Sequence, residues 1–279
     1  SLVSVTDTGS ELYAINQTGS GTLTGKASSL MEQALEICRR TDGALDLSIY
    51  PIVRAWGFTT GSYQVPDEAE IQALLPIVNY RKIQYDAATG TVTVTLPEGM
   101  EIDLGSVAKG YAGQLAAQML REHGVQSALL NLGGNVQTVG TKPDGSPWQI
   151  GIKDPQGEDA MMVLSVEDQA VVTSGGYERY FEQDGQTYWH IMDPSTGHPA
   201  DSGLISVTIV GDEGVVCDGL STALFVMGLE KAADLWAQSG DFEAVFVTAS
   251  GEVYITEGLR DHFALTERYA DTPVSVIER

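Results

Sequence analysis

An acid and a hydroxyl stand four residues apart at Asp218 and Thr222, inside an apolar run that predicts a helix from Val216 to Met227. Residues i and i+4 lie one above the other on a helix, so both oxygens share one face. A carboxylate and a hydroxyl in that arrangement suit Mg²⁺ held jointly with substrate phosphates. The structural alternative makes Asp218 an N-cap near the helix start and Thr222 an ordinary helical residue. The spacing alone leaves both interpretations open.

A second polar group begins at Asp103, where glycine and serine join an expected strand end to an amphipathic helix over Ala108–His123. The pattern predicts Lys109 in the first turn of that helix, where free N–H groups and the helix dipole attract anions. A lysine is unfavourable there unless an anion binds. An exposed lysine on a strand-to-helix connection explains the sequence equally well.

The segment from Val172 to Pro199 concentrates polar residues and glycines. Its pattern predicts a strand over Ala170–Thr173 that breaks at Ser174 and Gly175. Paired glycines leave backbone amides uncovered, as a loop needs when it approaches an anion closely. We therefore expect this break to be an anion-binding loop.

The same segment continues into a second strand-like run that ends near His190, followed by Asp193 in a turn. A nearby carboxylate could tune His190 as a general base close to neutral pH. A histidine beside Trp189 is also often just a packed residue. The paired glycines of Asn131–Asn135 predict a turn, with a ligand role as the less favoured interpretation.

Composition limits the partners. The 279 residues include 15 Lys+Arg against 38 Asp+Glu, a net charge of −23, which argues against binding nucleic acid or an anionic membrane surface. An anionic substrate would need locally placed cations. There is no membrane-spanning apolar run and no signal peptide at Ser1. Cys38 and Cys217 each lie in a helical apolar pattern, which predicts two buried thiols.

The order of elements predicts an α+β fold. Most neighbouring strands are separated by short turns, with helices inserted between them, which favours antiparallel sheets over a doubly wound parallel sheet. Tyr50, Trp56 and Phe58 are expected to pack in the core from a loop-rich stretch, although stacking on a planar ligand stays open. No linker is long enough to divide the chain, so a single domain over residues 1–279 is predicted.

Six ordered motifs together resemble the ApbE family of FAD:protein FMN transferases. They read SELYAIN at Ser10–Asn16, DGALDLSIYPIVRAWGF at Asp42–Phe58, DLGSVAKGYA at Asp103–Ala112, NLGGNV at Asn131–Val136, TSGGYERYF with HIMDPSTGHPA over Thr173–Ala200, and DGLSTALFVMG at Asp218–Gly228.

The resemblance implies a tunnelling-type α+β fold and a Mg²⁺-dependent enzyme that moves FMN from FAD onto a threonine hydroxyl of an acceptor protein, with release of AMP. Asp218, Thr222 and the carbonyl of Ala108 correspond to the family's metal ligands, and His190 to its base. Lys109, Ser174, Gly175 and Asp193 fall in blocks that surround the dinucleotide.

The family resemblance also implies an extracytoplasmic bacterial enzyme, held at the membrane only by a lipid anchor outside this chain. The family's leading strand and helix are expected to be missing before Ser10. Thr6 occupies a position where many members carry a tyrosine that covers the dinucleotide, and the absence of this tyrosine in some members goes with hydrolysis of FAD to FMN and AMP. An FAD pyrophosphatase and a non-catalytic FAD-binding envelope protein are therefore the alternatives.

Overall fold

The computed structural model describes residues 3–279. Contacts between Cα atoms divide the chain into two compact units. Unit 1 comprises Ser1–Ala108 and Arg179–Ala200, and unit 2 comprises Lys109–Glu178 and Asp201–Arg279. The single domain over residues 1–279 stays a prediction.

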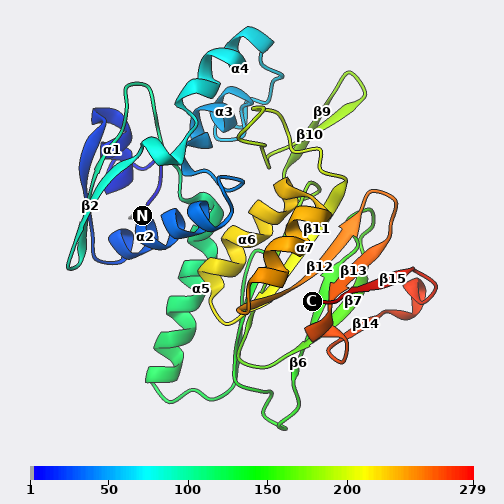
Figure 1. Cartoon of the computed structure of the whole chain (residues 1–279). Helices are drawn as coiled ribbons and strands as arrows, with labels where there is room; N and C mark the ends of the chain where they lie inside the picture. Colours follow the sequence, from blue (N-terminus) through cyan, green and yellow to red (C-terminus); the bar gives the residue numbers. More distant parts are fainter. Residues whose placement is uncertain (1–2) are drawn as a thin grey trace. The chain divides into compact units, whose positions relative to one another are not determined.

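Unit 1 joins helices to two small antiparallel sheets (Figure 1). One sheet has the strand order β1-β3-β2, and the other is the hairpin of β9 and β10. The elements are α1 (Glu11–Thr18), β1 (Ser20–Thr24), α2 (Gly25–Arg40), α3 (Tyr50–Ala55), α4 (Glu68–Leu74), β2 (Gln84–Ala88), β3 (Thr91–Thr95), β9 (Tyr180–Gln183) and β10 (Gln186–Trp189).

The stretch around Tyr50 is more regular than the loop-rich segment that the sequence predicts. It forms α3, with Pro51 in the first turn, where a missing N–H costs nothing. Trp56 and Phe58 follow the helix and are almost fully buried, so the predicted core packing is confirmed. The indole nitrogen of Trp56 donates to Gly197 O at 2.9 Å, which satisfies its one polar group.

Unit 2 is built on a seven-stranded sheet with the order β15-β13-β12-β11-β8-β5-β4 and a three-stranded sheet with the order β14-β7-β6. Helix α5 (Gly105–Glu122) enters the unit at Lys109. The other elements are β4 (Ala128–Leu132), β5 (Asn135–Val139), β6 (Trp148–Lys153), β7 (Ala160–Val166), β8 (Ala170–Gly175), β11 (Leu204–Gly211), α6 (Gly214–Met227), α7 (Leu229–Gln238), β12 (Phe242–Thr248), β13 (Val253–Thr256), β14 (Phe263–Leu265) and β15 (Val274–Ile277).

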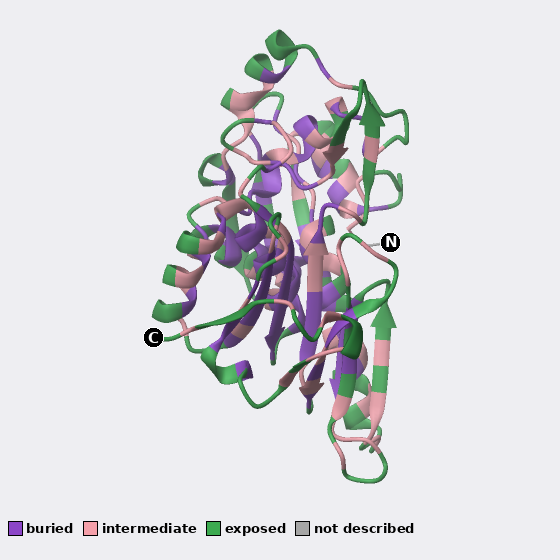
Figure 2. Cartoon of the chain, turned by 90° about the vertical axis from the view of Figure 1, so that its right-hand side faces the viewer, coloured by how far each residue is buried: buried purple, intermediate pink, exposed green. Residues whose placement is uncertain are grey.

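The central strands of unit 2 are covered on both faces (Figure 2). Side chains alternate along a strand, so each face takes every second residue. On β8, Val171 packs into the core shared with β6 and β7, whereas Ser174 contacts α6. A strand buried on both sides is continuously apolar except where a polar residue has a partner or a ligand.

The α+β prediction with largely antiparallel sheets is confirmed. β13 and β15 form the one parallel pair among residues 3–279. Two local predictions are wrong. β8 continues through Ser174 and Gly175, which pair with Val207 and Ser206 of β11, so the expected loop is part of the ladder.

The second wrong prediction concerns Asn135, which the sequence places in a turn. It opens β5, a strand that pairs with both β4 and β8. Gly133 and Gly134 make the turn with φ values of 64° and 89°. Both cysteines are free and buried, as predicted. Among the described residues, no helix is long and apolar enough to cross a bilayer.

Candidate functional site

Asp218 lies inside α6 and not at its start. The helix begins at Gly214 after the N-cap residue Glu213, which makes Asp218 the fifth helical residue. The N-cap interpretation is therefore wrong. Asp218 is only 5% exposed, although an ionised carboxylate is seldom buried without a partner.

A close crossing of α5 and α6 supplies one partner. Gly110 and Gly214 let the backbones meet, because a Cβ on Gly110 would lie 2.0 Å from Gly214 O. The backbone N–H of Gly110 then donates to Asp218 Oδ2 at 2.7 Å. The carboxylate is fixed between the two helices.

Burial raises the pKa of Asp218 from 3.8 to about 6. The Gly110 N–H, the ammonium of Lys109 and the amide of Asn135 oppose this rise without cancelling it. The contacts within the protein therefore do not fully offset the cost of burying the ionised Asp218 carboxylate. A cation at this carboxylate would offset the remainder.

The raised pKa of Asp218 predicts that the free energy of unfolding of the metal-free protein depends on pH. The folded protein keeps the Asp218 proton up to about pH 6, whereas the unfolded chain releases it near pH 3.8. The folded state therefore binds more protons between these values, and stability falls as pH rises from about 4 to about 6. Asp218→Asn removes this loss, so metal-free Asp218→Asn protein should exceed the wild type at pH 7.5 by roughly 3 kcal/mol.

Urea unfolding of both proteins in chelator, from pH 4.5 to 7.5, measures this difference directly. Other titrating groups cancel in the comparison. A gap that stays constant with pH would contradict the assigned shift.

Three hydroxyl groups from β8 and α6 lie close together, and one of them bonds the backbone carbonyl of Asp218. Ser174 Oγ on β8 lies 2.8 Å from Ser221 Oγ and 3.3 Å from Thr222 Oγ1, while Ser221 Oγ donates to Asp218 O at 2.8 Å. Thr222 stands one turn after Asp218, as the spacing predicts. The sheet and the helix thus bring the hydroxyls of Ser174, Ser221 and Thr222 together, and Asp218 lies one helical turn before Thr222.

This donor set fits Mg²⁺. One carboxylate with a neighbouring hydroxyl leaves several coordination positions for water and phosphate oxygens, which is the usual protein environment of this ion. Among residues 3–279, no three His, Cys, Asp or Glu side chains gather as a metal cluster, as zinc would require. The metal roles of Ala108, Asp218 and Thr222 stay predictions.

Lys109 is the fifth residue of α5, one position beyond the predicted first turn. It is exposed, and burial raises the pKa values of both Asp218 and Glu178 while the Lys109 ammonium opposes this rise. Two nearby carboxylates therefore account for a cation that seemed misplaced in the sequence. Ala108 precedes it in the same helix, on the other side of the division between the units.

A cavity of about 260 Å³ opens in unit 2 beside the glycine turn of β4 and β5. Its walls include Val136, Ile152 and Val171, and its polar lining includes Lys153 and Glu178. An apolar hollow with a few charged groups is typical of a small-molecule site. Gly175 lies behind Tyr177, which lines the cavity, since a Cβ on Gly175 would lie 2.3 Å from the Tyr177 ring.

His190 and Asp193 belong to unit 1, where they have separate partners. His190 follows β10, is half-buried, and places Nδ1 3.2 Å from Arg179 O. Asp193 Oδ1 accepts from Ser195 N at 2.8 Å and from Ser195 Oγ at 2.7 Å, which closes the turn after β10. The structure gives Asp193 a local turn contact, and its predicted dinucleotide role stays a prediction.

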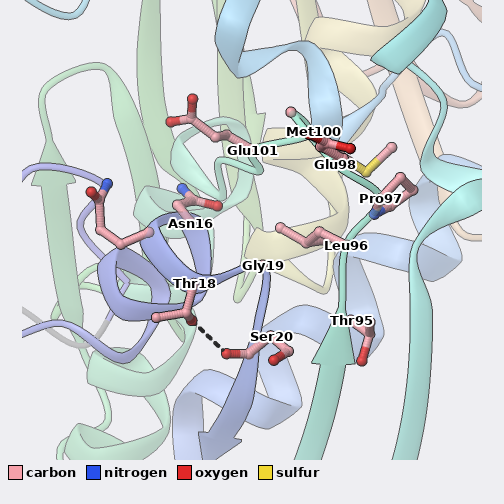
Figure 3. Close-up of a pocket in the computed structure, with 12 residues that line it drawn as sticks. Asn16, Thr18, Gly19, Ser20, Thr95, Leu96, Pro97, Glu98, Met100 and Glu101 are labelled. Carbon is pink, nitrogen blue, oxygen red and sulfur yellow. Dashed lines mark hydrogen bonds between the residues drawn. The ribbon is translucent and has the colours of Figure 1, made fainter.

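A larger hollow of about 510 Å³ lies in unit 1 at the end of α1 (Figure 3). Two of its polar side chains are already engaged. Thr18 Oγ1 donates to Ser20 O at 2.8 Å, and Asn16 exchanges hydrogen bonds with the backbone of Ile102. None of the residues with predicted roles lines it.

Sequence reasoning missed Asn135 and Gly110 as parts of the site. Asn135 faces Asp218, and Gly110 both donates to that carboxylate and permits the helix crossing. A signal for Asn135 was present: Asn135 and Gln137 flank Val136 in a short strand. Nothing in the local sequence marks Gly110 as the point where a second helix crosses.

Comparison with known proteins gives consistent matches. A family model described as "ApbE family" matches residues 1–246. A protein of Klebsiella pneumoniae (strain 342) named FAD:protein FMN transferase is 39% identical over 225 residues, which cover 80% of this chain and 69% of that protein. A Treponema pallidum (strain Nichols) protein of the same name is 35% identical over 269 residues, covering 90% of this chain and 74% of the relative.

Solved structures agree with these relatives. The ApbE protein of Thermotoga maritima superposes with a TM-score of 0.87 at 34% identity, over 94% of this chain and 86% of that one. The flavin transferase ApbE from Vibrio cholerae gives a TM-score of 0.82 at 28% identity, over 94% and 85% of the two chains. The fold predicted from the motifs is confirmed by these matches.

Proposed function

Because this chain belongs to the ApbE family, we propose that it is a transferase that moves FMN from FAD to a threonine hydroxyl of an acceptor protein, releasing AMP with the help of Mg²⁺. The observation that carries the proposal is the buried Asp218, held by Gly110 N–H one helical turn before Thr222. A carboxylate held in this way is prepared for a cation that also meets phosphate oxygens.

Asp218 and Thr222 would hold the metal, together with the carbonyl of Ala108. When bound, Mg²⁺ offsets the negative charge of the FAD diphosphate during phosphoryl transfer. Lys109 is exposed beside Asp218 and can meet a phosphate oxygen. These cations let a chain of net charge −23 bind an anionic substrate.

His190 would accept the proton of the acceptor threonine. The threonine oxygen then forms a bond to the flavin-side phosphorus, and the bond from that phosphorus to the bridging oxygen breaks. AMP leaves with the bridging oxygen and its electron pair. The contact of His190 Nδ1 with Arg179 O orients the ring, which leaves Nε2 as the basic atom when Nδ1 carries the proton.

Incubation of the protein with FAD, Mg²⁺ and an acceptor domain tests the proposal. We expect a flavin-fluorescent acceptor band that survives denaturation, and one AMP released for each flavin bound. Replacing the acceptor threonine with valine should abolish the band. FAD binding without any AMP release would leave only the non-catalytic alternative.

FAD hydrolysis is the second candidate, because Thr6 stands where the family often carries tyrosine. Thr6 is exposed, and its backbone N–H meets Ser4 Oγ at 3.2 Å. A short side chain covers less of a bound dinucleotide than an aromatic ring, so water has easier access. Free FMN and AMP in the absence of acceptor would support this candidate.

His190→Ala should separate transfer from hydrolysis. We expect transfer to fall by ~10²-fold or more, since general-base catalysis typically contributes 10²–10⁴-fold. Hydrolysis should fall less, because water reaches phosphorus without the same positioned base. Rates of band formation and of free FMN release give the two readouts.

His123→Ala is the matched control, since His123 is an exposed histidine at the end of α5. It should leave both rates unchanged. An unchanged transfer rate in His190→Ala would remove His190 from the mechanism. The extracytoplasmic location belongs to the same proposal and is tested by fractionating cells that express the full-length protein.

A further inference from the structure

Strand β5 carries two amide side chains into the interior of unit 2. Asn135 and Gln137 are each only 2% exposed. They lie two residues apart, so they share the face of the sheet that α5 and α6 cover. Val136 between them points to the opposite face, into the core with β6 and β7.

The helix crossing places the two amides differently. Gln137 lies under Gly214, whose Cβ would come within 2.9 Å of Gln137 Oε1. Asn135 lies under Gly113 and interacts with the carboxylate of Asp218. Gly110 and Gly113 lie one turn apart on α5, so Asp218 and Asn135 are neighbours under that helix, and the amide of Asn135 acts on the carboxylate. Gln137 Oε1 is buried without a hydrogen-bond partner.

The buried amide of Asn135 lacks the hydrogen bonds that such a group normally makes. Neither Asn135 Oδ1 nor Asn135 Nδ2 makes a hydrogen bond of normal geometry, although the amide is close enough to affect Asp218. Buried polar groups in proteins are normally paired, and one that is not calls for a specific reason such as a ligand. Valine or leucine would fill this position at lower cost if packing were its purpose.

We propose that Asn135 is a positioning residue whose amide orients the Asp218 carboxylate toward a bound divalent cation. The inference rests on the proposed metal role of Asp218 and extends it to a residue in a different element. Gly110 N–H fixes one carboxylate oxygen from α5, and Asn135 approaches the same group from the sheet. Groups that orient a metal ligand typically control metal affinity by about 10- to 100-fold.

Asn135→Leu tests the proposal with a side chain of similar size and no amide. Metal-free protein is titrated with Mn²⁺, and free Mn²⁺ is counted by electron paramagnetic resonance. We expect the dissociation constant to rise by about 10- to 100-fold. The melting temperature in chelator should stay the same or increase, because a poorly satisfied buried amide has been removed.

Gln137→Leu is the matched control. It removes an equally buried amide from the same face of β5 but leaves Asp218 its neighbour, so Mn²⁺ affinity should stay within about twofold of the wild type. Equal weakening in both variants would indicate a general packing effect and overturn the proposal. Wild-type affinity in Asn135→Leu would overturn it as well.

Asn135→Ala provides a second reading if the leucine variant does not fold, with the same expected loss of affinity. Wild-type protein and Asp218→Asn distinguish this inference from the proposed function. The proposed metal site is wrong if the wild type binds no Mn²⁺, or if the Asp218→Asn variant binds Mn²⁺ with the affinity of the wild type. In either case the inference about Asn135 is wrong too. If Asp218→Asn alone loses binding, only the role of Asn135 is overturned.

Discussion

Asp218→Ala should abolish FMN transfer while the protein still binds FAD. The Asp218 carboxylate is held between α5 and α6, and its replacement by a methyl group removes the anionic ligand proposed for the divalent cation. Metal ions contribute several kcal/mol to the stabilisation of phosphoryl transfer, so we expect a loss of at least ~10³-fold. FAD affinity should fall much less, because the substitution removes one proposed metal ligand and leaves Lys109, Ser174 and Gly175, which are predicted to surround the dinucleotide, in place.

Two measurements make this division of roles testable. Transfer is followed by acceptor fluorescence after denaturation, and FAD affinity by quenching of flavin fluorescence. Asp212→Ala serves as the control, since Asp212 is an exposed acid just ahead of the same helix. Parallel loss of binding and turnover in Asp218→Ala would refute the separation, as would transfer that stays within tenfold of the wild type.

The elements with strong periodicity were predictable from the sequence. The runs that predicted α5 and α6 appear as helices, extended by two or three residues at their N-terminal ends. Short polar segments were harder. β5 reads as a turn because Gly133 and Gly134 precede it and because two of its first three residues are amides, yet it lies buried between β4 and β8.

The pairing of Asp218 with Thr222 was also predictable, because i and i+4 spacing fixes a shared helix face. The neighbours of Asp218 were not, since Gly110, Asn135 and Ser174 come from three other segments. Such contacts depend on how α5 and α6 cross above the sheet. Two glycines set that crossing, and a glycine inside a helix looks the same in sequence whether a second backbone touches it or not.

Gly110→Ala should therefore strongly destabilise unit 2. Its Cβ would lie 2.0 Å from Gly214 O and 2.7 Å from Asp218 Cβ, and a backbone carbonyl cannot turn aside as a side chain can. The helices must separate, which removes the Gly110 N–H bond to Asp218. We expect a loss of about 3 kcal/mol or more in the free energy of unfolding, at the upper end of overpacking effects.

Gly113→Ala, one turn later in α5, is an unusually close control. Its nearest neighbours would be 3.7 Å from the new Cβ, which is ordinary van der Waals contact, and alanine is the better helix former by ~1 kcal/mol. Urea unfolding should therefore rank Gly113→Ala at or above the wild type and Gly110→Ala far below it. If both variants behaved alike, the close crossing would not be what holds Asp218 in place, and the carboxylate would need another source of rigidity to present a metal ligand.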